Sequence, residues 1–158
     1  MGEEITEIEL YAAFPQLIND ADFKVTSPLS PNYNCIAWAL HYDDRWMWPG
    51  GVEAKNLDGF HYWPDGVEDN EDVTSFIEAF QLKDYKVCDK WEHEEGYRRI
   101  ALYVKEGTTE CTHAARELSS GKWTSKLGKD KDIQHGTPFS IEGPTYGKVY
   151  CFMKIEFM

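Results

Sequence analysis

The spacing of apolar residues changes partway along this chain of 158 residues. In the first half, apolar residues recur at intervals of three and four, as they do on one face of a helix. After residue 98 they gather in short runs separated by Gly-containing turns, a pattern typical of antiparallel strands. Helices that precede strands predict an α+β fold, with N-terminal helices packed on a C-terminal antiparallel β-sheet.

Several helices and strands are expected from this pattern. The expected helices span residues 3–13, 35–40 and 72–82, and the expected strands span residues 99–104, 112–118, 122–127 and 149–155. In the first helix, Ile5, Ile8 and Ala12 share one face, which predicts that this face packs on the core. Residues 44–71 combine tryptophans with Pro and Gly, so we expect an irregular segment there. Its tryptophans either wall a substrate cleft or fill a core beneath the segment: Trp46, Trp48 and Trp63.

The length fits one domain over residues 1–158, and the composition argues against several classes of function. Sixteen Lys and Arg against 28 Asp and Glu give a net charge of −12, which disfavours binding to nucleic acid or to an anionic membrane. The N-terminus is acidic and no apolar run has the roughly 20 residues of a membrane helix. We therefore expect a cytoplasmic location and leave secretion as an effector open. Four cysteines without a CxxC pair predict reduced thiols, and we expect neither a metal nor another cofactor.

Cys35 is the residue whose position points most directly to chemistry. It follows the turn-forming run SPLSPNYN (residues 27–34) and opens the expected helix 35–40. Unpaired backbone N–H groups and the positive end of a helix dipole favour a thiolate over a thiol there. His113, at the start of an expected strand, is a candidate base for such a nucleophile. The alternative is that Cys35 is a small buried apolar residue and that His113 is a hydrogen-bonded core histidine.

A catalytic Cys–His pair also needs a group that orients the imidazole. Asp132 and His135 can fold back to Nδ1 of His113, or else Asp132 caps a turn and His135 lies at the surface. A zinc site built from Cys35, Cys111, His113 and His135 is a further alternative, but its spacing is not that of a known closed site.

The residues before Cys35 could complete an oxyanion hole with its backbone N–H. Asn32, Tyr33 and Asn34 are the nearest candidates, although Asn32 or Asn34 is alternatively an ordinary helix N-cap. Arg116 and Lys126 lie on neighbouring expected strands, where they either hold a substrate carboxylate or pair with acidic neighbours.

Four segments within residues 9–154 carry a resemblance to known proteins: NCIAWAL, RIALYV, THAARELSSGKWTSKLG and DIQH. Their arrangement resembles the small papain-like cysteine hydrolases of the NlpC and CHAP type. It is more closely similar to an uncharacterised group of small bacterial proteins that share NCxAWA, THAAR, WTSKLG and DIxH segments. The resemblance implies that Cys35 attacks an amide carbonyl, that His113 takes and returns the proton, and that His135 or Asp132 orients His113.

The function expected from this resemblance is a cysteine-dependent amide hydrolase or transferase, such as a peptidase, amidase or deamidase, acting on a peptide or protein. The candidates to bind the substrate or its oxyanion are Tyr33, Asn34, Trp38 and Trp123.

The alternative is a non-catalytic acidic interaction module on the same fold, immunity-like or a scaffold, that binds a basic protein partner. The two functions differ at Cys35. A catalytic thiol is reachable by solvent, lies near a ring nitrogen of His113 and has a depressed pKa, whereas a scaffold buries it.

Overall fold

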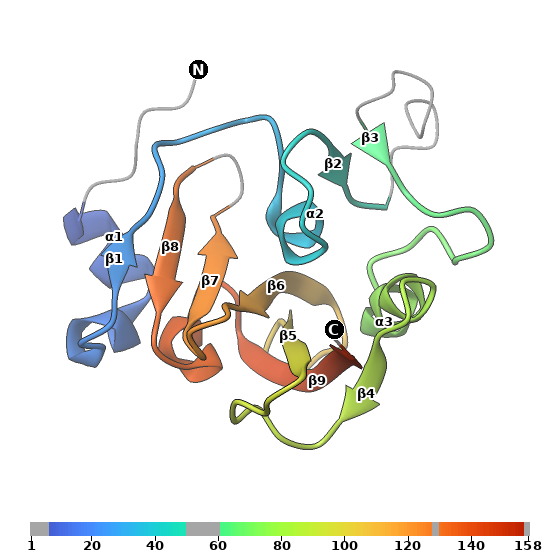
Figure 1. Cartoon of the computed structure of the whole chain (residues 1–158). Helices are drawn as coiled ribbons and strands as arrows, with labels where there is room; N and C mark the ends of the chain where they lie inside the picture. The colour runs from blue at the N-terminus through green and yellow to red at the C-terminus, as the bar shows by residue number, and fades with distance from the viewer. Residues whose placement is uncertain (1–6, 50–60, 128–129, 157–158) are drawn as a thin grey trace.

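The computed structural model describes residues 7–49, 61–127 and 130–156 of the chain (Figure 1). Seven strands form one sheet in the order β1-β8-β7-β6-β5-β9-β4, and every neighbouring pair in it is antiparallel. These strands are β1 Lys24–Val25, β4 Lys86–Cys88, β5 Tyr97–Val104, β6 Cys111–Glu117, β7 Trp123–Lys126, β8 Asp132–His135 and β9 Lys148–Glu156. A separate parallel pair consists of β2 Trp46–Met47 and β3 His61–Tyr62. The α-helices are α1 Glu7–Ala13, α2 Cys35–Ala39 and α3 Val73–Gln81, and the 3₁₀ helices are η1 Pro15–Asn19 and η2 Pro138–Ile141.

The α+β class and the antiparallel sheet expected from the sequence are confirmed. The expected long strands correspond to β5, β6, β7 and β9, and the later two expected helices correspond to α2 and α3. The short strands β1, β4 and β8 were not expected from the sequence. Within the described part of the chain, no helix has the length and apolarity needed to cross a bilayer.

Each face of the sheet carries its own apolar core. On one face, α2, α3 and the β2–β3 pair bury Ile36, Phe76 and Met47 against the strands (Figure 1). On the other face, Leu10 of α1 and Leu17 of η1 pack against the opposite set of strand residues. The two sets alternate along β5 and β6 because successive side chains of a strand point to opposite faces. Ile100, Leu102 and Ala114 belong to the first core, whereas Ala101, Tyr103 and Ala115 belong to the second.

The prediction of which face of the first helix packs on the core is wrong. Ile8 is 83% exposed and Ala12 is also exposed, whereas Leu10 is buried. The third residue of the expected face, Ile5, lies outside the described residues. In the tertiary structure Leu10 reaches the core together with Phe14, four residues later, and a helix of this length can present either stripe.

Two of the three tryptophans of the segment 44–71, Trp48 and Trp63, contribute to the first core. Trp63 is fully buried and its ring packs edge-on against Phe76 of α3, and Trp48 packs on the same ring. This segment therefore contains core residues under a loop, the second of the two expectations. Residues 50–60 of it lie outside the described residues.

Candidate functional site

Strand β6 separates the two residues of the expected catalytic pair. Cys35 belongs to the same core as Cys111 and Ala114 of β6, on the face that α2 covers. His113 is the neighbour of Ala114, so its side chain points to the other face of the sheet. Its contacts agree, because it pairs in register with Tyr103 and stacks on Tyr146, both in the second core. The structure therefore does not bring the Cys35 thiol and the His113 imidazole together.

The surroundings of Cys35 favour the neutral thiol. Cys35 is 7% exposed, and burial raises the pKa of its thiol to about 11, although backbone groups of Ala114 and Ile36 lower it in part. The dipole of α2, a helix of only five residues, does not overcome this loss of solvation. A thiolate at this position is therefore disfavoured at neutral pH. The start of α2 does not activate Cys35 as the sequence led us to expect.

A cluster of polar side chains surrounds the start of α2, on the same face as Cys35. The Tyr33 hydroxyl donates to Asp132 Oδ2 at 2.7 Å, and Lys126 Nζ donates to the Ser30 carbonyl at 2.7 Å while lying 4.8 Å from the centre of the Tyr33 ring. Burial raises the pKa of Asp132, and the hydrogen bond from Tyr33 opposes that shift. Burial likewise lowers the pKa of Lys126, and the charge of Asp132 opposes it. Asp132 therefore stabilises this cluster and does not orient His113.

The ring of Trp38 continues this cluster towards β6 and β7. Trp38 Nε1 donates to Thr124 Oγ1 at 3.1 Å, and the Arg116 guanidinium lies over the Trp38 ring at 4.5 Å. Arg116 Nη1 also lies 3.2 Å from His41 Nδ1. Among the described residues, Arg116 forms no ion pair with a neighbouring acid; its guanidinium contacts Trp38 and His41 instead. The geometry also does not show Arg116 and Lys126 sharing a pocket for a carboxylate.

His113 belongs instead to a buried chain of hydrogen bonds, which we call the histidine chain: His113, Ser125 and His135. His113 Nε2 lies 3.0 Å from Ser125 Oγ, which lies 2.8 Å from His135 Nε2. His135 Nδ1 lies 2.8 Å from the Thr137 carbonyl. All three side chains are fully buried. From the sequence we expected His135 to contact Nδ1 of His113. In the structure the two imidazoles are instead linked through Ser125, and each contacts its hydroxyl through Nε2.

The protonation of the histidine chain can be assigned from its acceptors. The Thr137 carbonyl only accepts, so His135 Nδ1 carries a proton and its Nε2 accepts from the Ser125 hydroxyl. Ser125 in turn accepts from His113 Nε2. Both imidazoles are then neutral, which agrees with burial lowering the pKa of His135 to about 4 and that of His113 well below its ordinary value. His113 is therefore a buried, hydrogen-bonded core histidine, which is the second of the two hypotheses drawn from the sequence.

The remaining expected binding residues have structural roles. Asn34 caps α2 by accepting from the Ala37 N–H at 3.2 Å, and its amide also bonds the backbone N–H and carbonyl of Met47 at 3.0 and 2.8 Å. Its side-chain donor is therefore occupied and does not face an oxyanion. Trp123 is fully buried in the second core, on the face opposite Cys35.

Two features of these sites had no signal in the sequence. Tyr146, whose ring stacks on His113 at 3.9 Å, is 33 residues away, in a loop. The bridging role of Ser125 depends on the register of three strands. In the part of the chain that the structure describes, no group of three or more His, Cys, Asp or Glu side chains is placed to hold a metal ion.

Together these features define an α+β domain with buried polar clusters on both faces of one antiparallel sheet. Residues 24–154 match the family model described as Domain of unknown function (DUF7689), and the chain belongs to that family. Comparison with curated proteins and with solved structures finds no match.

Proposed function

We propose that this domain is a non-catalytic, acidic protein-interaction module built on a papain-like arrangement of a cysteine-bearing helix on an antiparallel sheet. The observation that carries the proposal is a group of carboxylates that line one shallow hollow, which we call the acidic edge: Glu71, Asp72 and Glu110.

The acidic edge is held together by the backbone of two distant segments. An isolated β-bridge joins Asp72 to Glu110, and the Cys111 N–H donates to the Glu71 carbonyl at 2.8 Å. Thr109 Oγ1 donates to Asp72 Oδ1 at 2.6 Å. A shallow hollow of about 360 Å³ lies between these residues. The Asp72 carboxylate is thus fixed by a hydrogen bond, and the backbones of Glu71 and Glu110 are held beside it.

Few cations neutralise this edge. Among the described residues, none of these three carboxylates forms an ion pair. A basic partner can therefore pair with them, and the net charge of −12 steers its approach. The chemistry that fits the edge is a Lys- or Arg-rich protein segment.

The environment of Cys35 supports a non-catalytic module over a hydrolase. A buried thiol with a pKa of about 11, on the far side of the sheet from the candidate base, lacks both thiolate and proton acceptor. We therefore expect iodoacetamide to label Cys35 no faster than the half-buried Cys88, with no effect of His113→Ala. Fast labelling with an apparent pKa below the ~8.5 of a free thiol, lost in that variant, would instead support a hydrolase.

The binding proposal is tested with a fluorescent oligolysine peptide, followed by fluorescence polarisation at two salt concentrations. The Glu71→Gln/Glu110→Gln variant removes two charges from the acidic edge. The matched control, Asp84→Asn/Glu156→Gln, also removes two charges. Asp84 follows the C-terminal end of α3, and Glu156 is the last residue of β9. We expect the first pair to weaken binding about tenfold more than the control, a difference of ~1.4 kcal/mol. Equal effects of the two pairs would mean that only net charge matters, and the proposal would be wrong.

A further inference from the structure

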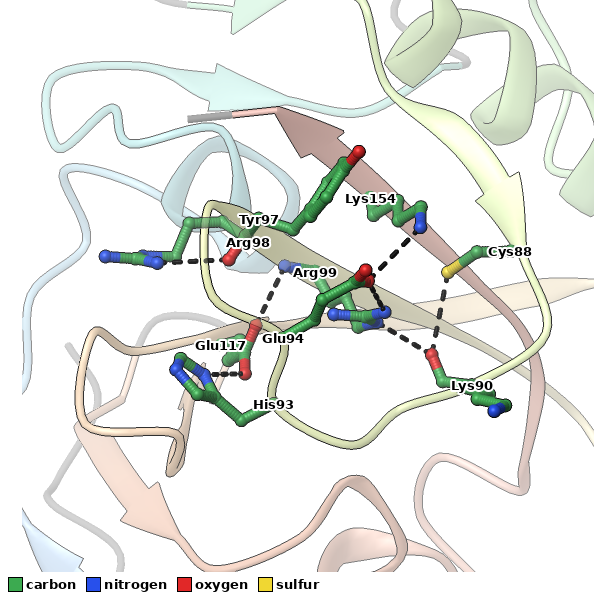
Figure 2. Close-up of polar contacts among 9 residues, drawn as sticks. All are labelled: Cys88, Lys90, His93, Glu94, Tyr97, Arg98, Arg99, Glu117 and Lys154. Atoms are coloured by element: carbon green, nitrogen blue, oxygen red, sulfur yellow. Dashed lines mark hydrogen bonds and ion pairs between the residues drawn. The ribbon is translucent and has the colours of Figure 1, made fainter. Parts of the chain in front are cut away.

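A second polar cluster lies where β5, β9 and the loop after β4 meet (Figure 2). Its centre is Arg99, whose side chain is only 3% exposed. Arg99 Nε donates to the Lys90 carbonyl at 2.8 Å and Nη2 donates to Glu94 Oε1 at 2.7 Å. Its third nitrogen, Nη1, is buried and makes no hydrogen bond to a described residue, although the Cys88 thiol lies beside the guanidinium. A buried charged donor without an acceptor is costly, so this position favours an additional acceptor.

Two cations converge on one oxygen of Glu94. Oε1 of Glu94 accepts from Arg99 and also lies 3.2 Å from Lys154 Nζ, as Figure 2 shows. These two cations hold the pKa of Glu94 below its ordinary value. Lys154 is further positioned over the Tyr97 ring, 4.2 Å from its centre. Glu94 is thus the one carboxylate that Arg99 and Lys154 share, although the hollow as a whole is lined by as many acids (Asp89, Glu92, Glu94) as Lys and Arg side chains (Lys90, Arg99, Lys154).

Glu94 is the least fixed member of this group. Its side chain is 45% exposed and it comes from the loop between β4 and β5, whereas Arg99 and Lys154 lie on neighbouring strands of the sheet. A hollow of about 670 Å³ opens beside them and is lined by Cys88, His93 and Arg99 among others. A carboxylate from outside could therefore reach the same cations if Glu94 turned away.

The surrounding groups fix the shape of the hollow. Glu117 is buried beneath it, where Oε1 accepts from the Arg99 backbone N–H at 3.2 Å and Oε2 lies 2.9 Å from His93 Nδ1. The Cys88 thiol lies at the rim, 3.6 Å from the Lys90 carbonyl that also holds Arg99. Glu117 therefore fixes the backbone of Arg99, and the bond from Nε to the Lys90 carbonyl still holds the guanidinium when Glu94 is not bound to it.

We propose that this hollow binds a small carboxylate ligand, which pairs with Arg99 and Lys154 in the place that Glu94 occupies. A guanidinium presents parallel donors that match the two oxygens of a carboxylate. When Glu94 leaves, Nη1 and Nη2 form such a fork, and the unpartnered Nη1 gains its acceptor. Glu94 is thus an internal competitor, and the site does not depend on the acidic edge or on Cys35.

Cys88 provides a local probe, because it lines the same hollow. Iodoacetate and iodoacetamide both alkylate a thiolate with loss of iodide, but only iodoacetate carries a carboxylate. The ratio of their rates at Cys88, read by peptide mass spectrometry, is divided by the same ratio in the urea-unfolded chain to remove intrinsic reactivity. The net charge of −12 by itself lowers this quotient below one, whereas the proposed site raises it above one.

Three variants test which groups carry the effect. We expect Glu94→Gln to raise the quotient about fivefold and Lys154→Gln to lower it by a similar factor, since an exposed ion pair is worth up to ~1 kcal/mol. Glu92→Gln is the matched control, because it removes an acid that also lines the hollow but makes no ion pair with a described residue. A titration with propionate, with propionamide as the neutral control, should move the NMR signal of the Arg99 Nε–H. A quotient at or below one, equal effects of Glu94→Gln and Glu92→Gln, or an Arg99 signal that does not move would each overturn the proposal.

Discussion

The histidine chain makes the stability of this protein depend on pH in a window above the titration of ordinary carboxylates. His113 and His135 are buried in their neutral forms, and burial lowers the pKa of His135 to about 4, from an ordinary value near 6.5. Between these two pH values the unfolded chain binds a proton that the folded chain does not. Stability is therefore complete above pH ~6.5 and is lost as the pH falls towards ~4.

The size of this effect follows from linkage. At pH 5, an unfolded imidazole is almost fully protonated, whereas His135 in the folded chain is about one tenth protonated. The resulting loss of unfolding free energy is about 2 kcal/mol relative to pH 7. His113 adds a loss of the same sign, because burial also lowers its pKa. Asp132, whose pKa burial raises, acts in the opposite direction from the other face of the sheet.

The assay is urea unfolding of the wild type and of His135→Gln at pH 7 and at pH 5, with the free energies extrapolated to zero denaturant. We expect the wild type to lose about 2 kcal/mol more than the variant between these two pH values. Ser125→Ala is the control: it removes a hydrogen bond of the same chain but no titratable group, so it should lower stability similarly at both pH values. An equal pH dependence in wild type and His135→Gln would refute the neutral assignment of His135.

Three further substitutions test the account of the fold. Asn34→Ala should cost about 2–4 kcal/mol in urea unfolding, because it removes the α2 cap and leaves two buried backbone groups of Met47 unsatisfied, whereas Asn34→Asp should retain the cap. Gly147→Ala should cost more than Gly107→Ala in thermal unfolding: both have a φ of +81°, but only at Gly147 would a Cβ clash with a backbone carbonyl, and equal losses would contradict this packing. Tyr33→Phe should cost about 1–3 kcal/mol by leaving a buried carboxylate oxygen without its donor, and no loss would mean that water replaces the hydroxyl.

Cys35 and His113 lie on opposite faces of the sheet, although the segments that carry them fit the papain-like pattern. The segments NCIAWAL and THAARE place a Cys at a helix start and a His on a strand, as the papain-like resemblance requires. In the regular part of the pairing between β5 and β6, Tyr103 pairs with His113 and Leu102 with Ala114, and the register shifts only beyond them, where Val104 pairs with Cys111. The facing position beneath α2 then belongs to Ala114. A register difference of one residue moves a side chain to the other face of a sheet.

The sequence by itself determined the elements whose signals are local. The spacing of Val73, Phe76 and Phe80 specifies α3, and the run before Cys35 specifies where α2 begins, because helix periodicity and capping act over three or four residues. The long strands β5, β6 and β9 could be predicted because short apolar runs bounded by turn-forming residues are also a local signal. The tertiary structure alone decided which face each strand residue takes and which distant groups meet. The His113–Ser125–His135 chain and the Arg99–Glu94–Lys154 cluster both depend on strand register, which is set by packing across the whole sheet and leaves no local pattern.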